Sequence, residues 1–162
     1  MSLYFYPHPL LTKPTVNVDE TNRHEILSFI DEARALLSAL PSALAIAANQ
    51  CGRSHRMFIT APGKTTLPEI VVNPKWSYGP YGMELDKEGC LSFPGHNLDI
   101  RRYKNVLLDY FDEQGNHSID EFNGLDARII QHECEHLDGK TFLQNTDRRT
   151  KYRIIEAMRK RK

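Results

Sequence analysis

The chain has 162 residues, its 21 Lys and Arg residues balance 21 Asp and Glu residues, and 40% of its residues are hydrophobic. This length suits one domain with a real core, and the balanced charge and ordinary hydrophobic content indicate a globular, soluble protein. The sequence lacks an apolar run of about 18 residues, which excludes a transmembrane helix, and its opening lacks the pattern of a signal peptide. The three cysteines, Cys51, Cys90 and Cys134, form an odd set without the spacing of a disulfide framework, so we expect a cytoplasmic location.

The first element that the sequence predicts is an amphipathic helix over residues 20–40. Its apolar side chains recur at helical spacing, and Pro41 ends it because proline lacks the backbone N–H that a helix needs. Short strands are predicted at 57–60, 70–73, 106–111 and 117–121. The last two strands flank a polar turn that contains Gly115, which predicts a hairpin.

A second helix is predicted to begin at Gly124 and Leu125 and to end at Gly139, which is typical of a glycine C-cap. Short strands around one inward-facing helix indicate an α+β fold, with short antiparallel sheets around this central helix, rather than a parallel α/β fold. A C-terminal helix over residues 147–162 is expected to belong to the same single domain as the catalytic region, 1–146.

The central helix carries the most informative motif of the chain, His132-Glu133-Cys134-Glu135-His136, which is the HExxH pattern of metal hydrolases. An α-helix advances about 100° per residue, so His132 and His136 project from one face and can bind one divalent ion. Glu133 follows the first histidine, where it can take the proton of an activated water molecule. Cys134 lies about 200° around the helix from His132, so it is expected to be a core thiol. The motif predicts a metal-binding helix without specifying the reaction.

Two histidines are an incomplete catalytic site, because such sites usually have three protein ligands. The third histidine of the longer metzincin motif is excluded, because Phe142 occupies that position. The distant glutamate of gluzincins would be Glu156, but this residue lies in the basic terminal segment 148–162. Cys90 is the better candidate, because it lies where a strand gives way to a turn and would complete a set of one cysteine and two histidines.

Three blocks of the sequence resemble the peptide deformylase family, in the same order. Residues 43–50 read ALAIAANQ, similar to the family's GxGxAAxQ, residues 88–92 read EGCLS, and residues 131–139 contain QHExxHxxG. The opening YPHPLL at 6–11 is also similar, and the likeness covers most of residues 4–145. The EGCLS and HExxH pair is highly specific, whereas AAxQ alone is a weak signal.

The resemblance implies an enzyme that hydrolyses the N-terminal formyl group of formylmethionyl nascent peptides with one divalent metal ion. It implies that Cys90, His132 and His136 hold this ion. Ligation by one cysteine and two histidines suits several metals, and the resemblance favours Fe²⁺ in the cell, with Zn²⁺, Ni²⁺ or Co²⁺ as alternatives.

The resemblance also assigns catalytic roles to residues around the metal. Glu133 would accept the proton of the attacking water and then deliver it to the departing amine. The side-chain amide of Gln50 and the backbone N–H of Leu91 would stabilise the oxyanion that forms on the formyl group. Glu88 and Arg102 are expected to form a structural ion pair near the ligand loop.

A substrate pocket is implied next to the metal, lined by Leu44, Ala45, Leu125, Arg128 and Ile129. Alanines at positions 43 and 45 replace glycines of the family and bring methyl groups close to the substrate backbone. Arg128 stands where the family has an apolar residue for a methionine side chain. We expect Arg128 to extend to solvent or to pair with Asp86; otherwise the pocket prefers a different side chain. Glu135 replaces an aspartate and is expected to bind a partner near the site rather than the metal.

The C-terminal segment 147–162 contains eight Lys or Arg residues and two acidic residues. A modest apolar stripe indicates a helix packed lightly on the body of the protein, and the resemblance adds an expected ribosome contact. The other expected partners are formylated nascent peptides; no membrane contact is expected, and the chain is expected to be a monomer.

Two alternatives to the deformylase function stay open. One is a related metal-dependent N-acyl amidohydrolase or metallopeptidase that uses Glu156 in place of Cys90, and the other is a ribosome-binding, deformylase-like protein with altered specificity.

Overall fold

The computed structural model describes residues 2–160, and its first long helix is α1 (Arg23–Ala39). This helix confirms the amphipathic helix predicted at 20–40, and it ends before Pro41. One face of α1 packs on strands β1 (Ala45–Ala47) and β2 (Met57–Thr60). The buried side chains of that face are Ile26, Phe29, Ile30, Ala33 and Leu37.

Two antiparallel sheets form the rest of the framework. The larger sheet has the strand order β1-β2-β3-β6-β7, with β3 (Ile70–Tyr78), β6 (Asn105–Phe111) and β7 (His117–Asn123). The smaller sheet consists of β4 (Met83–Gly89) and β5 (Asn97–Tyr103). Every paired strand runs antiparallel to its neighbour. The neighbours β3 and β6 are joined through the β4–β5 sheet, which lies between them in the chain.

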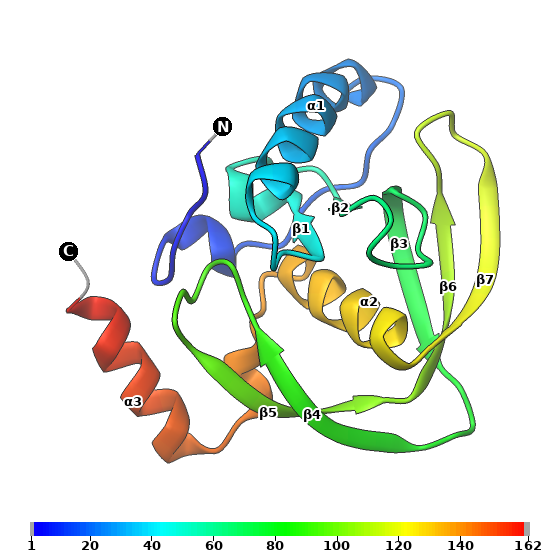
Figure 1. Ribbon diagram of the computed structural model, residues 1–162. Helices are drawn as coiled ribbons and strands as arrows, with labels where there is room; N and C mark the ends of the chain where they lie inside the picture. The colour runs from blue at the N-terminus through cyan, green and yellow to red at the C-terminus, as the bar shows by residue number, and fades with distance from the viewer. Residues whose placement is uncertain (1, 161–162) are drawn as a thin grey trace.

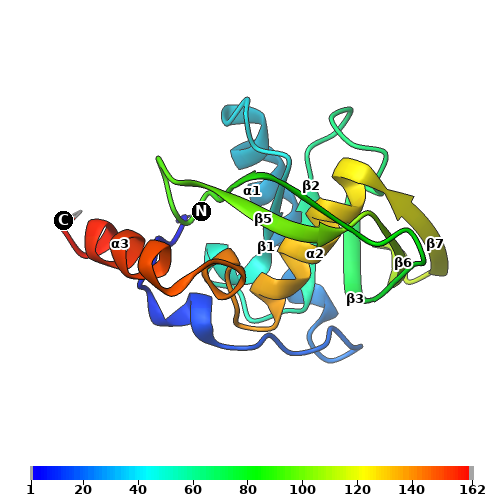
Figure 2. The ribbon, with the colours of Figure 1, turned by 90° about the horizontal axis from the view of Figure 1, so that it is seen from below.

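Helix α2 (Gly124–Leu137) lies at the centre of the molecule, between the large sheet and the β4–β5 sheet (Figures 1 and 2). Its apolar side chains Ala127, Ile130 and Leu137 are fully buried and belong to a cluster that includes residues of β3 and β6. Gly139 ends the helix with a positive φ of 70°, and a Cβ there would lie 2.8 Å from the backbone of Lys13. The predicted glycine C-cap is therefore confirmed, and the absence of a side chain lets the N-terminal segment pass close to the end of the helix.

The chain ends in the 3₁₀-helix η3 (Phe142–Asn145) and helix α3 (Arg148–Arg159), which lies at one side of the molecule (Figure 1). Ile154 and Met158 of α3 are buried in a cluster with Phe93. Residues 161 and 162 of the predicted C-terminal helix lie outside the described residues. Within residues 2–160, every helix is too short or too polar to cross a membrane.

The predicted strands are all present. Residues 57–60 form β2, residues 70–73 begin the longer β3, and the hairpin of residues 106–111 and 117–121 is formed by β6 and β7. The strand expected to end just before Cys90, for which no bounds were given, is β4; strands β1 and β5 were not predicted. The α+β class, with short antiparallel sheets around a central helix and a helix at the C-terminus, is confirmed.

Candidate active site

Two elements bring the three candidate metal ligands together. His132 and His136 project from one face of α2, and Cys90 is the first residue after β4. The ligand atoms of the three side chains all lie within 4.8 Å of one another, with Cys90 Sγ at 3.1 Å from His136 Nε2. Within residues 2–160, this is the only such group of His, Cys, Asp or Glu side chains that could hold a metal ion.

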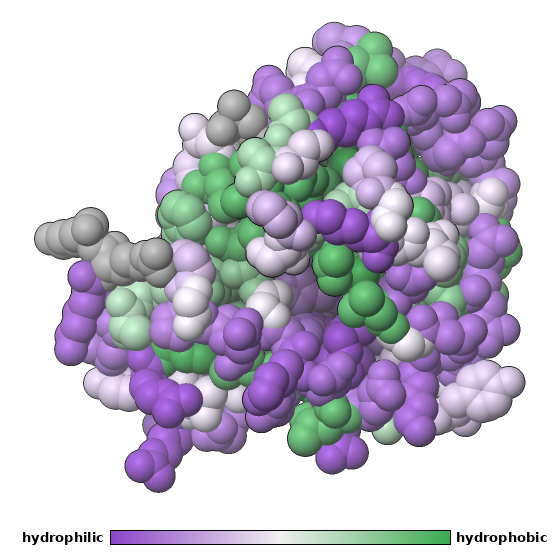
Figure 3. All heavy atoms as spheres, in the orientation of Figure 1, coloured by the Kyte–Doolittle hydropathy of each residue, from purple (hydrophilic) through white to green (hydrophobic). Residues whose placement is uncertain are grey.

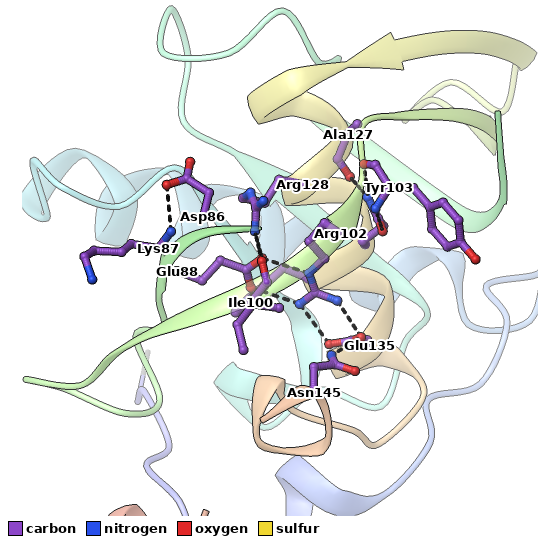
Figure 4. Close-up of polar contacts among 12 residues, drawn as sticks. Asp86, Lys87, Glu88, Ile100, Arg102, Tyr103, Ala127, Arg128, Glu135 and Asn145 are labelled. Carbon is purple, nitrogen blue, oxygen red and sulfur yellow. Dashed lines mark hydrogen bonds and ion pairs between the residues drawn. The ribbon is translucent and has the colours of Figure 1, made fainter. Parts of the chain in front are cut away.

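A buried carboxylate orients the first histidine. Glu88 Oε2 lies 2.9 Å from His132 Nδ1, which leaves His132 Nε2 free to bind a metal. Arg102 donates two hydrogen bonds to Glu88, at 2.8 and 2.9 Å, so the predicted pair is present (Figure 4). Burial opposes the ionisation of Glu88, but the hydrogen bonds from Arg102 and His132 outweigh it and hold its pKa well below the usual range. The anionic form of Glu88 is therefore favoured beside the ligand group.

The same arginine reaches a second carboxylate. Arg102 also donates two hydrogen bonds to Glu135, which in turn accepts one from Asn145 Nδ2 at 2.6 Å (Figure 4). Glu135 thus points away from the candidate metal ligands toward a partner near the site, as its position on the helix indicates. Asn145 was not singled out in the sequence, because a polar residue in a short connecting segment carries no distinguishing signal.

Glu133 lies on the wall of the same cavity as Cys90 and His132. Its side chain is 5% exposed, and its Oε2 atom has no hydrogen-bond partner within residues 2–160. Burial raises the pKa of Glu133 to about 7, against the opposing charge of His132. A buried carboxylate oxygen without a partner is costly, so this atom fits a site that receives a water molecule or a substrate group.

Gln50 turns its amide toward the ligand group. Its Oε1 accepts a hydrogen bond from the backbone N–H of Ala47 at 3.0 Å, which fixes the orientation of the amide. Its Nε2 donates to Ser92 Oγ at 3.0 Å and lies 3.6 Å from Cys90 Sγ. Leu91, the residue after the cysteine, lines the same cavity. Ser92 is an additional polar residue of the site, and the EGCLS block contains it without indicating its contact with Gln50.

A cavity of about 740 Å³ opens in front of these residues. Figure 3 shows its mouth as a hollow in the face of the molecule, with both hydrophobic and hydrophilic residues around it. The segments 42–45, 87–97 and 125–133 supply most of its wall. All five residues predicted to bind substrate line this cavity, namely Leu44, Ala45, Leu125, Arg128 and Ile129.

The surroundings of Arg128 differ from those that were predicted for it. It is only 5% exposed, and its Nη1 atom donates to Glu88 Oε1 at 2.8 Å and to the carbonyl oxygen of Ile100 at 2.9 Å. The expectation that it extends to solvent or pairs with Asp86 was therefore wrong. Asp86 lies two residues before Glu88 on β4 but is exposed. A hydrogen bond between the guanidinium and the buried carboxylate of Glu88 is stronger than one to an exposed carboxylate.

The remaining cysteines and the alternative ligand take no part in this group. Cys51 and Cys134 are buried free thiols, and burial raises the pKa of Cys51 to about 12. Glu156 lies in α3, where it accepts a hydrogen bond from Arg159 at 3.2 Å. It is absent from the group of ligand atoms that the structure brings together.

The residues fit a resident divalent ion, because one thiol and two oriented imidazoles converge beside a carboxylate with an unpartnered oxygen. An HExxH helix with this donor set and an open cavity defines a metal-dependent hydrolase. The chain belongs to the polypeptide deformylase family, because the model of that family matches residues 1–152. Its activity is accordingly the metal-dependent hydrolysis of the N-terminal formyl group of formylmethionyl peptides.

Individual relatives agree over nearly the whole chain. The peptide deformylase of Borreliella burgdorferi is 33% identical over 99% of this chain and 97% of its own length. That of Rhodopirellula baltica is 37% identical over 88% of this chain and 71% of its own length. The crystal structure of Thermotoga maritima peptide deformylase has a TM-score of 0.81 and 27% identity, covering 90% of this chain and 97% of the other. The crystal structure of Arabidopsis thaliana peptide deformylase 1B has a TM-score of 0.87 and 26% identity, covering 99% of this chain and 91% of the other.

Proposed function

We propose that Cys90, His132 and His136 hold the metal ion of this deformylase and that Glu133 moves the proton during hydrolysis. The observation that carries this proposal is the buried Glu133 carboxylate, which has an unpartnered oxygen and shares a cavity with the three converging ligand atoms. A carboxylate placed only for stability would have its oxygens satisfied by donors.

The ion is proposed to be Fe²⁺ in the cell, and Zn²⁺, Ni²⁺ and Co²⁺ are alternatives that one thiolate and two imidazoles can also bind. When bound, the ion supplies Lewis acidity and lowers the pKa of a water molecule toward neutrality. Because Cys90 is partly accessible, its thiolate is open to oxidation, and the ferrous enzyme is expected to lose activity in air.

The chain's own residues handle the proton and the developing charge. A pKa of about 7 suits Glu133 for accepting a proton at neutral pH and returning it to the departing amine. The Gln50 amide and the Leu91 backbone N–H are proposed to donate hydrogen bonds to the formyl oxygen as it becomes negative. The hydrogen bond from the Ala47 N–H to Gln50 supports this role, because it orients the amide before substrate arrives.

The peptide is proposed to bind in an extended conformation along β1. This strand is at the edge of the large sheet, so its free side can pair with a peptide backbone. The first side chain would then enter the pocket lined by Leu44, Ala45, Leu125, Arg128 and Ile129. The methyl group of Ala43, which also lines the cavity, narrows the approach without blocking it.

Formate release from a formyl-Met peptide tests the role of Glu133. Glu133→Gln is expected to keep its metal and to lose about 10²–10⁴ in kcat, because only the proton acceptor is removed. Glu20→Gln, an exposed matched change, should leave kcat unchanged. Near-normal turnover by metal-loaded Glu133→Gln would assign the proton transfer to another group.

The C-terminal region 147–162 is proposed to belong to the same domain as residues 1–146 and to contact the ribosome. Its buried Ile154 and Met158 support the first point, and the exposed Arg149 and Arg153 on the opposite side of α3 support the second. We propose a monomer that works in the cytoplasm, where nascent peptides emerge. The double variant Arg149→Gln, Arg153→Gln should weaken ribosome binding and its salt dependence, while kcat on short peptides stays constant. Unchanged ribosome binding by this variant would refute the proposed contact.

A further inference from the structure

Arg128 is a charged residue on the wall of an otherwise largely apolar part of the catalytic cavity. It precedes His132 by four residues on α2, so the two side chains share one face of the helix, about 6 Å apart along its axis. Apolar Leu125 and Ile129 flank it on the same wall, and Leu44 faces the same cavity. A substrate side chain that enters the cavity next to the reacting group would therefore contact these apolar side chains and the guanidinium of Arg128.

The protein uses only part of the hydrogen-bonding capacity of this guanidinium. Nη1 donates to Glu88 Oε1 and to the carbonyl oxygen of Ile100, and Nη2 donates to the carbonyl oxygen of Glu84 at a long 3.4 Å. An arginine has five N–H donors, so Nε–H and one N–H of Nη2 have no acceptor among residues 2–160. Since Arg128 lines the cavity, a ligand there can supply the missing acceptor.

The charge of Arg128 is already balanced. Glu88 accepts hydrogen bonds from both Arg128 and Arg102, and Arg102 also pairs with Glu135, so two guanidinium groups face two carboxylates (Figure 4). Such a cluster has no excess positive charge with which to select an anion. The unused N–H donors remain, and they recognise a neutral acceptor as well as a charged one.

We propose that Arg128 determines substrate specificity by donating a hydrogen bond to the end of the first side chain of the formylated peptide. The preferred class is an unbranched side chain that carries an acceptor near its end. The sulfoxide oxygen of oxidised methionine and the amide oxygen of glutamine are good acceptors, the sulfur of methionine is a weak one, and norleucine has none. This inference rests on the proposed function, because it requires the formyl group to lie at the Cys90, His132 and His136 group.

The bonds that hold Arg128 support a specificity role. Its hydrogen bonds to Ile100 and Glu84 connect α2 to both strands of the β4–β5 sheet, which fixes the guanidinium in place. A preorganised donor selects an acceptor more sharply than a mobile one, because little conformational freedom is lost on binding. A site built around a hydrogen bond also disfavours an analogue that cannot make it.

The test compares kcat/KM for formate release from four tripeptides, formyl-Met-Ala-Ser and its norleucine, glutamine and methionine sulfoxide analogues. The wild-type enzyme should favour the glutamine and sulfoxide peptides over the norleucine peptide. Arg128→Met should lower these two ratios by about tenfold or more. Arg101→Met, an exposed matched change on β5, should leave both ratios unchanged.

The outcomes separate this inference from the proposed function. Hydrolysis of formyl-Met-Ala-Ser with equal ratios in wild type and Arg128→Met would overturn the role of Arg128 and leave the deformylase activity intact. If Arg128→Met does not fold, the wild-type ratios decide, because a wild-type preference for norleucine over glutamine and sulfoxide overturns the inference. Failure of the metal-loaded wild type to release formate from any of the peptides would overturn both.

Discussion

Replacing Arg102 with methionine removes the cation that joins two carboxylates beside the proposed metal ligands. Arg102 is 3% exposed and donates to Glu88 at 2.8 and 2.9 Å and to Glu135 at 2.5 and 3.0 Å. Methionine fills much of the same volume, so the substitution tests the charge and its hydrogen bonds rather than the packing. Arg102→Met therefore leaves Glu88 and Glu135 without their principal hydrogen-bond donor.

The structure sets the size of the expected loss. Removing one member of a buried ion pair typically costs about 3–5 kcal/mol, because a buried charge is left uncompensated. Glu88 keeps its contacts with Arg128 and His132, and Glu135 keeps Asn145 and has a side chain that is 20% exposed. We therefore expect a loss at the lower end, about 3 kcal/mol in the free energy of unfolding, or about 6–12 °C in Tm for a chain of this size.

Thermal and urea unfolding of the metal-loaded protein at neutral pH measure this loss. Arg101→Met, on the same strand but exposed, should change stability by less than about 0.5 kcal/mol. Adding Glu135→Gln to Arg102→Met should restore about 1 kcal/mol, because the second uncompensated carboxylate is then neutral. If Arg102→Met costs no more than Arg101→Met, the two carboxylates are stabilised by something other than this guanidinium, and the reasoning fails.

Two further changes test separate parts of the structure. Gln50→Ala should lower kcat by about 10²–10³ with a much smaller change in KM. Gln114→Ala, at the exposed hairpin turn, should leave both unchanged. If Gln50→Ala raised KM and left kcat unchanged, the proposed oxyanion contact would be contradicted. Gly139→Ala should cost at least about 2 kcal/mol by urea unfolding, because φ is 70° and the added Cβ would lie 2.8 Å from backbone. Gly63→Ala has a φ of 72° and nothing within 4 Å of the added Cβ, so it should cost only about 1 kcal/mol, and equal losses at both positions would rule out the backbone contact.

The histidine pair of the candidate metal site was predictable from the sequence because its spacing is local. Two histidines four residues apart on a helix share a face whatever the rest of the fold does, and the glycine that ends the helix is equally local. Cys90 was chosen because the usual third ligands of HExxH sites are missing, and the resemblance supported it, since its approach to α2 depends on how β4 meets the helix. The partner of Arg128 was missed for a related reason. Asp86 and Glu88 lie on the same side of β4, and only the depth of each side chain in the structure separates them.

The bounds of β4 and the whole of β5 were not predicted, for physical reasons. Six of the seven residues of β4 are exposed or half-buried, so it has no alternating apolar pattern and is held mainly by its pairing with β5. Along β5, Leu98 and Ile100 alternate inward as expected for a strand, but the next inward residue is Arg102. A buried arginine breaks the apolar pattern, and it is tolerated only because Glu88 and Glu135, from other elements, meet it.

X-ray absorption of the metal-loaded protein tests the central claim most directly, because it reports which atoms bind the ion. For the zinc form, the account predicts one sulfur ligand at about 2.3 Å and two imidazole nitrogens at about 2.0–2.1 Å, with the sulfur signal lost in Cys90→Ser. A spectrum without sulfur in the wild-type protein, or one that Cys90→Ser leaves unchanged, would contradict it.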